Sequence, residues 1–538
     1  MPYWQELQMD QQIIVNAELH ETRIAILEDG RLVELLVERP DEERNVGAIY
    51  KGRVEAVLPG MQAAFVELGL DRTAFLHISD VGFDSSASSR YDFDLIEEED
   101  QNGGPELIRK TRQTPIESLL EKDKDILVQV IKEPLGQKGA RVSTLISFPG
   151  RFLVLVPNEN HVRVSRKITN WNERRRLRRI LFDHKPDGFG VIIRTEAEHQ
   201  SERILKKDLI RLLKIWNRIT RKYERSKSPQ LLHQEAGITS SIIRDIFSQE
   251  TSKLVVDSKD SYKKIISYVK GVAPKLKDRV ELYRGAVPIF DVYNIEPEID
   301  KMLDRKVWIK KGAYLVIDQT EAMVTIDVNT GRFVGSKDQE NTILRVNLEA
   351  AKEIARQIRL RDIGGLIVID FIDMYNRDNR RKLLEEFKSH FRYDRAKNAI
   401  LPVSDFGLIE MTRERSRPSL LQTFSIPCPS CQGLGRIYSP ETIVMRIERW
   451  FARAKAGSKY RKFDLKVHPN VAEILNGGNT NKLRDICRQH RFKIDLLLDE
   501  SLFPENYRII SHDEDMDITE MYKTKAELAA DENHENAG

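Results

Sequence analysis

Two aspartates that end strand-like segments are the strongest candidates for chemistry in this sequence. Asp327 is the last residue but one of the alternating segment 322–328, and Asp370 follows the continuous apolar run Leu366–Ile369, which suits a buried strand. Residues 338–361 between them repeat alanine and isoleucine at helical spacing. Such a strand–helix–strand unit normally makes two parallel neighbours. We therefore expect both carboxylates at the same, carboxyl-terminal sheet edge, where α/β folds place their sites.

Two acids at one edge repel each other unless a cation lies between them. Mg²⁺ suits such a pair because it takes few protein ligands and keeps bound waters. Asn329 lies two residues after Asp327 and faces the same side, where it can hold a metal-bound water. The alternative for each acid is a cap at a strand–turn junction, and that alternative also stays open for Asp318 and Asp373.

Two phenylalanines are predicted on the solvent face of short strands. In segments 63–68 and 73–78, alternation places small and branched apolar residues on one face and Phe65 or Phe75 on the other. Exposed aromatic rings on a small barrel are how OB-folds stack bases. The alternative is that the 84–116 insertion or another domain buries both rings. The nearby cations that could contact phosphates are Lys51, Arg53 and Lys138.

The stretch 143–227 is basic and contains a second candidate site. Here the run Val191–Ile193 is followed directly by Arg194 and Thr195. A buried strand that ends in this way delivers a guanidinium and a hydroxyl together, and both bind phosphate. The sequence therefore suggests a pocket for a terminal phosphate. A helix with a buried apolar stripe follows, and its other faces hold Lys206, Lys207, Arg211, Lys214 and Arg218.

A turn-rich Cys-Pro-Ser-Cys knuckle brings Cys428 and Cys431 together. Zn²⁺ needs four ligands and one knuckle supplies two, while Cys487 lies in a helical pattern and reads as a core thiol. Either two chains share one zinc, which implies at least a dimer, or the cysteine pair is redox-active. A redox pair usually opens a helix in a thioredoxin-like unit, and we expect no such unit here. The shared zinc is therefore favoured.

The 538-residue length allows three to five domains, and the 40% hydrophobic content allows packed cores. The 87 basic and 84 acidic residues nearly cancel, so net charge does not indicate nucleic acid. No apolar stretch approaches 18 residues and no secretory signal is apparent at the start, so we expect neither a membrane span nor export. Three cysteines suit a reducing cytoplasm.

The elements that must position these residues form several groups. Residues 13–38 predict a β-meander, and 46–82 predict a small β-barrel to which the strand Asp125–Ile131 returns. The residues 84–116 read as a loop insertion. Further on, an α/β unit is expected over 303–424. A smaller α/β segment would follow the knuckle.

These motifs resemble the bacterial ribonuclease E/G family over roughly residues 13–525. The stretches that carry the resemblance are Val46–Asp80, Thr325–Asn329 (Thr-Ile-Asp-Val-Asn), Asn347–Met374 and the Cys-Pro-Ser-Cys knuckle. Within the family the sequence is most similar to the ribonuclease G branch, since it has no long disordered C-terminal scaffold. It departs from the family pattern in its extra N-terminal residues, in the 84–116 insertion and at Thr330.

The resemblance implies a multidomain fold of α+β and α/β parts. An RNase H-like subdomain would carry two inserted domains and would precede a DNase I-like catalytic α/β subdomain. In chain order the expected division is 1–43 and 240–302 (RNase H-like), 44–142 (S-one-type OB-fold, RNA-binding), 143–239 (5′-monophosphate sensor), 303–424 (DNase I-like), 425–439 (zinc-link), 440–525 (small oligomerisation domain) and 526–538 (disordered tail).

The resemblance also assigns roles. Asp327 and Asp370 would hold a catalytic Mg²⁺, and Asn329 would orient a metal-bound water. Cys428 and Cys431 would bind a structural Zn²⁺ shared between two chains of a homodimer or homotetramer. The RNA contacts would be Phe65, Phe75 and Lys138. The 5′-phosphate pocket would consist of Arg194, Thr195, Gly150, Val154 and Arg166.

The function implied is a single-strand-specific, cytoplasmic endoribonuclease. Hydrolysis with Mg²⁺ would leave 5′-phosphate and 3′-hydroxyl ends, and a 5′-monophosphate on the substrate would stimulate cutting. Processing of ribosomal RNA and turnover of mRNA are the family's tasks. One competing class is a non-catalytic RNA-binding scaffold, which would not need both acids. A DNA phosphoesterase is a third class, disfavoured by the OB-fold and the terminal-phosphate pocket.

Overall fold

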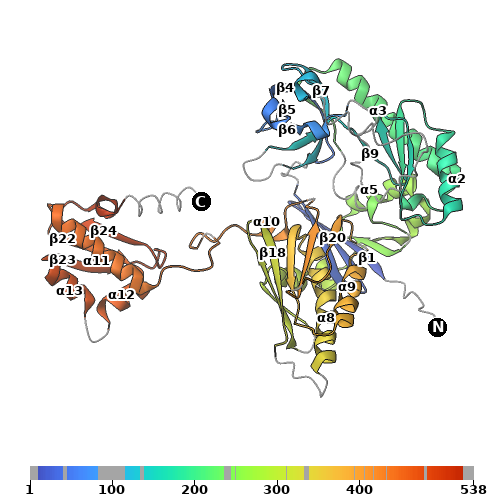
Figure 1. The fold of residues 1–538 in the computed structure, drawn as a ribbon. Helices are drawn as coiled ribbons and strands as arrows, with labels where there is room; N and C mark the ends of the chain where they lie inside the picture. Colours follow the sequence, from blue (N-terminus) through green and yellow to red (C-terminus); the bar gives the residue numbers. More distant parts are fainter. Residues whose placement is uncertain are drawn as a thin grey trace. The chain divides into compact units, whose positions relative to one another are not determined.

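The computed structural model divides into two compact units, residues 1–421 and 422–538, and each is described by itself (Figure 1). The residues that the structure describes are 10–39, 45–82, 115–133, 139–234, 244–248, 250–309, 312–331, 339–392, 394–404, 406–415, 417–431, 433–477 and 481–524. Lys138, the predicted tail 526–538 and nearly all of the predicted 84–116 insertion lie outside these residues.

A five-stranded sheet opens the first unit and is completed much later in the chain. Its order is β15-β14-β1-β2-β3, with β1 to β3 as the predicted antiparallel meander and β14 and β15 added in parallel. The helix α5 (Lys259–Val272) packs against β14 and β15. The strands are β1 (Gln11–Ala17), β2 (Thr22–Glu28), β3 (Arg31–Glu38), β14 (Thr251–Val256) and β15 (Val280–Leu282).

The predicted small barrel is present and closed. Its five strands run in the order β4-β5-β6-β8-β7, and β4 pairs with β7 to close the ring. Gly52 is required inside it, because a Cβ there would lie 2.6 Å from Val66 Cγ1. A further strand, β13 (Gln230–His233), adds to β4. The barrel strands are β4 (Ile49–Leu58), β5 (Ala63–Glu67), β6 (Ala74–His77), β7 (Asp125–Lys132) and β8 (Arg141–Ser143).

A four-stranded sheet with two helices lies between the barrel and the return to the first sheet. Its order is β11-β12-β10-β9, and the predicted helix is α3 (Glu202–Arg225). The leucines of the predicted stripe are buried, whereas Trp216 is half-buried. The remaining elements are β9 (Phe148–Pro149), β10 (Leu153–Pro157), β11 (Val162–Val164), β12 (Phe189–Ile193) and α2 (Trp171–Phe182).

A six-stranded mixed sheet, β16-β17-β18-β19-β21-β20, carries the two candidate acids. One face packs on α8 (Gln339–Leu360) and α9 (Arg377–His390) through residues such as Ile354, Ile367 and Phe387. The other face is open, so Leu366 is 40% exposed and the expectation of a strand buried on both faces was wrong. The strands are β16 (Lys306–Trp308), β17 (Tyr314–Gln319), β18 (Met323–Asn329), β19 (Gly365–Asp370), β20 (Asn398–Ile400) and β21 (Leu408–Arg413).

The second unit is a small α/β body. Its sheet has the order β23-β22-β24-β25, with β22 and β23 parallel, and Trp450, Phe451 and Phe463 form the centre of its core. Its elements are α11 (Pro440–Gly457), β22 (Lys462–Val467), α12 (Pro469–Asn476), α13 (Lys482–His490), β23 (Lys493–Leu498), β24 (Tyr507–Ser511) and β25 (Met516–Asp517).

Short helices elsewhere in the chain are α6 (Ile289–Val292), α7 (Glu296–Lys301) and α10 (Leu420–Phe424). Within the described ranges, every helix is too short or too polar to cross a bilayer. The mixed α/β, multidomain architecture expected from the sequence is therefore the one that the structure shows.

Candidate active site and RNA-contacting surfaces

Asp327 and Asp370 lie directly opposite each other on neighbouring strands. The strands β18 and β19 are parallel and are joined through α8, and their register pairs Asp327 with Asp370. Both residues alternate with buried isoleucines, Ile326 and Ile369, so their carboxylates project from the open face of the sheet. Cross-strand partners on one face have Cβ atoms about 5 Å apart. One cation can therefore be reached by both side chains.

The electrostatics of this edge favour a bound cation. Burial, together with the neighbouring carboxylates of Asp327 and Asp373, raises the pKa of Asp370. Asn329 shares the face of Asp327, and its Nδ2 donates a hydrogen bond of 2.7 Å to Asp327 Oδ2. Carboxylate and amide oxygens are hard ligands, so this donor set fits Mg²⁺.

A buried asparagine that sequence reasoning did not single out positions the segment after Asp370. Asn347 is fully buried on α8, where its Nδ2 donates to Ile372 O (2.8 Å) and its Oδ1 accepts from Ile372 N (3.1 Å). This pair of bonds anchors the backbone between Asp370 and Asp373 to the helix. The signal in the sequence was an amide on the apolar helix face, four residues before Ala351.

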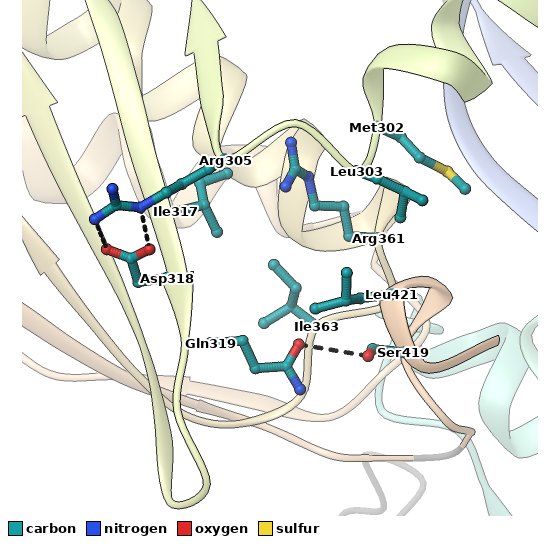
Figure 2. A pocket seen from close by; sticks show the side chains of 10 residues that line it. All are labelled: Met302, Leu303, Arg305, Ile317, Asp318, Gln319, Arg361, Ile363, Ser419 and Leu421. Carbon is teal, nitrogen blue, oxygen red and sulfur yellow. Dashed lines mark hydrogen bonds and ion pairs between the residues drawn. The ribbon is translucent and has the colours of Figure 1, made fainter. Parts of the chain in front are cut away.

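Asp318 belongs to the opposite end of the sheet. It pairs with Thr325 in register, and Arg305 Nη2 donates to its Oδ2 at 2.7 Å, which lowers the pKa of Asp318. A cavity of about 240 Å³ opens at this end (Figure 2). Burial lowers the pKa of Arg361 in its wall to about 10. Neither Asp327 nor Asp370 lines this cavity, so it is separate from the acid pair.

Phe65 and Phe75 form an aromatic pair on the outside of the barrel. They are opposite each other on β5 and β6, both are half-exposed, and their ring centroids are 6.2 Å apart in an edge-to-face arrangement. His77 extends the row, with its ring stacked 6.4 Å from that of Phe75. Arg141 of β8 is the register partner of Phe75 on the other side. The guanidinium of Arg141 is itself held by the buried Asp80 carboxylate, with Nη2 2.7 Å from Oδ2, so the surface presents adjacent aromatic rings beside a paired cation.

Lys51 is not available for phosphate, contrary to the expectation from the sequence. Its Nζ donates to the carbonyl oxygens of Tyr223 (3.1 Å) and Ser226 (2.9 Å), and its side chain is 12% exposed. Arg53 remains more exposed, although its Nε lies 3.6 Å from Asp125. The ammonium of Lys51 instead ties the end of α3 to the barrel.

Arg194 and Thr195 follow the end of β12, and by alternation from Ile192 the Arg194 side chain falls on the sheet face that α2 and α3 do not cover. Nη1 of Arg194 donates to Gly150 O (2.8 Å), and the Thr195 hydroxyl lies 3.1 Å from that of Ser165. Val154 is buried on the same face, opposite Ile192. A Cβ on Gly150 would lie 2.6 Å from the Asp208 carboxylate, so no other residue fits there.

Two residues beside Arg194 went unnoticed in the sequence. Asp245 Oδ1 accepts from Arg194 Nη1 at 2.7 Å, and Arg244 holds both oxygens of Asp245 at 3.0–3.1 Å. Burial would raise the pKa of Asp245, but the charges of Arg194 and Arg244 outweigh it and hold that pKa below its usual range. Of the proposed pocket residues, Arg166 is exposed and follows Ser165.

The cysteines are placed as a turn in the second unit. Cys428 is exposed and Cys431 half-exposed, and neither opens a helix, since α11 begins at Pro440. Hydrogen bonds from the backbone of Cys431 and Ser430 lower the pKa of the Cys428 thiol, which favours the metal-binding thiolate. Cys487 lies on α13 against the core, as predicted.

Other metal-competent side chains meet elsewhere in the same unit. Asp464, Asp495 and His512 bring ligand atoms within 4.8 Å of one another on the sheet. The cysteines do not take part in this group. Across the described part of the chain, neither cysteine is joined by further ligands of its own unit, so one chain alone does not complete a four-ligand zinc site there.

Comparison with known proteins finds a matching family model in each of the two units. A family model described as the Ribonuclease E/G family matches residues 147–416. A second, described as the RNase E/G thioredoxin-like domain, matches residues 427–513. The expectation that no thioredoxin-like unit is present was therefore wrong. A redox-active pair usually opens a helix, whereas this knuckle lies nine residues before α11, counted from Cys431 to Pro440.

Curated relatives align over most of the chain. Ribonuclease G of Escherichia coli is 38% identical over 478 residues, which cover 89% of this chain and 95% of the relative. Ribonuclease G of Haemophilus influenzae is 38% identical over 464 residues, covering 86% and 91%. Ribonuclease E of a Nostoc species is 36% identical over 431 residues, covering 79% and 59%. The chain belongs to the ribonuclease E/G family.

Proposed function

We propose that this protein is an endoribonuclease that hydrolyses phosphodiester bonds of single-stranded RNA with Mg²⁺. The observation that carries the proposal is the cross-strand pairing of Asp327 with Asp370 at an open sheet edge. It occurs in a chain whose relatives are named ribonuclease G and ribonuclease E. The products would carry 5′-phosphate and 3′-hydroxyl ends.

At the acid pair, Asp327 and Asp370 would hold the cation between their carboxylates. When bound, Mg²⁺ lowers the pKa of a coordinated water and neutralises charge on the scissile phosphate. Asn329 donates its Nδ2 to Asp327, which leaves its Oδ1 free to accept a hydrogen bond from the attacking water. Asn347 acts at a distance, since its two bonds to Ile372 fix the backbone that follows Asp370.

The barrel would hold the substrate as a single strand. Its five-stranded closed form supports the assignment as an S-one-type OB-fold. The half-exposed rings of Phe65 and Phe75 would stack on successive bases, and Lys138 would contact phosphate. Bases are free to stack on protein rings in a single strand but not within a duplex. Single-strand specificity follows from this surface.

A pocket at Arg194 and Thr195 would bind a 5′-monophosphate. Nη1 of Arg194 is anchored to Gly150 O and to Asp245, so its Nε and Nη2 atoms form the edge that would face the phosphate. The remaining walls would come from Gly150, Val154 and Arg166. Holding the 5′ end there would orient the downstream segment over the acid pair and so stimulate cutting.

The same proposal assigns the parts of the chain. The five-stranded sheet would belong to an RNase H-like subdomain (1–43 and 240–302), and the six-stranded sheet to a DNase I-like one (303–424). Cys428 and Cys431 would share a structural Zn²⁺ with a second chain, giving a homodimer or homotetramer. Kinship with bacterial ribonucleases supports a cytoplasmic role in ribosomal RNA processing and mRNA turnover.

Cleavage of matched substrates tests the proposal. Single-stranded RNA with a 5′-monophosphate should be cut with Mg²⁺, spared in EDTA, and spared by the variant Asp370→Asn. DNA of the same sequence should be spared as well. An RNA-binding scaffold would bind the RNA and leave it whole under every condition, and a DNA phosphoesterase would cut the DNA.

A further inference from the structure

Five cationic side chains line one face of the C-terminal half of α3. They border, together with Asn217, an open hollow of about 640 Å³, and all are exposed. Their spacing of three or four residues places them on the same side of the helix. From first to last they extend over about 16 Å. We call the set the α3 stripe: Lys214, Arg218, Arg221, Lys222 and Arg225.

Within the part of the chain that the structure describes, no carboxylate neutralises the positive charge of the α3 stripe. The Lys222 ammonium donates to Leu231 O, while the described residues provide no carboxylate partner for the other four members. The first half of the same helix is different. There Lys206 pairs with Glu202 at 2.7 Å and Arg211 with Asp208 at 3.4 Å. Two of the four cations in the first half of α3 are thus paired with carboxylates, whereas no described carboxylate pairs with any of the five in the stripe.

The stripe lies beside the barrel. Tyr223 and Ser226, at the end of α3, accept hydrogen bonds from Lys51 of β4. The chain then continues directly into β13, which pairs with β4. Figure 1 shows α3 reaching from the four-stranded sheet to the barrel. A polyanion that runs over the barrel surface can therefore continue along the helix.

We propose that the α3 stripe binds the phosphodiester backbone of an RNA segment outside the cutting site. This inference rests on the proposed ribonuclease function. Guanidinium groups bind phosphates bidentately, and backbone contacts add affinity and orientation without selecting bases. The hollow is lined by polar side chains alone. A protein partner would instead need an apolar centre at its interface.

Two triple variants of the full-length protein test the inference. One is Arg218→Gln with Arg221→Gln and Arg225→Gln. The control is Lys263→Gln with Lys264→Gln and Lys270→Gln, which removes the same charge from the exposed side of α5. Three RNAs share one cutting site: a short strand, the same strand extended by single-stranded RNA, and the same strand extended by a hairpin.

We expect the stripe variant to raise KM for an extended RNA roughly tenfold, while kcat stays unchanged. KM for the short RNA should also stay unchanged. For a single-stranded extension, the slope of log affinity against log salt should fall by about 2. The extension that loses affinity identifies whether the stripe holds a single strand or a helix. A variant with lysine at the three arginine positions should keep most of the affinity, since the charge remains.

Two results overturn the inference. One is an unchanged KM for both extended RNAs in the stripe variant. The other is an equal rise of KM in the α5 control variant, which would indicate a general effect of net charge. Both leave the ribonuclease function standing as long as the short RNA is cut at the normal rate. If the unmodified protein cuts none of the three RNAs, the proposed function itself fails.

Discussion

The carboxylate of Asp245 lies 2.7 Å from Nη1 of Arg194, the side chain proposed to bind the substrate's 5′-phosphate. Arg244 donates a hydrogen bond to the other oxygen of the same carboxylate and also donates to Pro149 O at 3.3 Å. A negative charge is thus built into the wall of the proposed phosphate pocket. It anchors Arg194, and it would also repel a phosphate that enters the proposed pocket.

Magnitudes decide which effect of Asp245 prevails in the variant Asp245→Asn. Without the Asp245 carboxylate, the Arg194 side chain is more mobile, and ordering it on phosphate binding costs about 1 kcal/mol. The cost stays this small because Gly150 O still holds Arg194. Removal of a charge roughly 6 Å from the phosphate gains up to about 3 kcal/mol at an effective dielectric of 20. The ratio of kcat/KM for 5′-phosphate over 5′-hydroxyl RNA should therefore rise severalfold. The variant Asp187→Asn, an exposed acid of the same region, should leave the ratio unchanged, and a falling ratio would show that anchoring prevails.

Replacing either acid of the pair by asparagine should greatly slow cutting. Asp327→Asn and Asp370→Asn each remove a carboxylate that would hold Mg²⁺. We therefore expect kcat to fall about a thousandfold in each variant. Asn329→Ala should cost less, since it removes only the orientation of water. RNA affinity, measured by fluorescence anisotropy, should stay close to normal. Undiminished cutting by Asp370→Asn would exclude the assigned metal site.

Truncating the aromatic pair should weaken binding without changing the chemical step. Phe65→Ala and Phe75→Ala each remove a stacking platform worth about 1–3 kcal/mol per base. KM for single-stranded RNA should rise accordingly, with kcat preserved. Phe182→Ala, at an exposed phenylalanine on α2, serves as the control. Equal effects at all three positions would argue against a specific RNA platform.

Removing the cysteine knuckle should dissociate the proposed zinc-linked oligomer. Cys428→Ser or Cys431→Ser leaves fewer than four thiolates between two chains, so zinc content and oligomer size should both fall. Sizing by light scattering together with metal analysis measures both. Cys487→Ser should retain zinc, since this residue lies against the core of its own unit. Full zinc content in Cys428→Ser would refute the shared site.

Glu173 gives a pH-dependent contribution to stability. Hydrogen bonds from Arg176, and from the backbone of His199, lower its pKa from 4.5 to about 2. A depressed carboxyl pKa stabilises the fold above the unfolded value and loses that effect as pH falls through the folded value. Glu173→Gln should cost about 2 kcal/mol at neutral pH, after allowance for the part-exposed Arg176. The difference in free energy of unfolding between the unmodified protein and Glu173→Gln, measured with denaturant, should disappear between pH 4.5 and 2. A difference that does not change with pH would contradict the assignment.

Local periodicity was enough to predict several features. Alternation in segments 63–68 and 73–78 placed Phe65 and Phe75 on one face, and the structure has them opposite each other on β5 and β6. The crossover between Asp327 and Asp370 predicted two parallel strands, and the register pairs these two residues. Both inferences use the fixed repeat of a strand and the near-universal geometry of a short crossover.

Other features depended on how separate segments pack. Asp245 meets Arg194 although 51 positions separate them, and Lys51 meets Tyr223 across 172 positions. Sequence periodicity says which face a side chain takes, but not which distant segment covers that face. The open side of β19 illustrates this, since an apolar run looked buried on both faces while helices cover one. Motifs and periodicity were therefore sufficient to identify the family, the acid pair and the aromatic pair. The partners of the charged groups become visible only in the folded protein, because domain packing brings distant segments together.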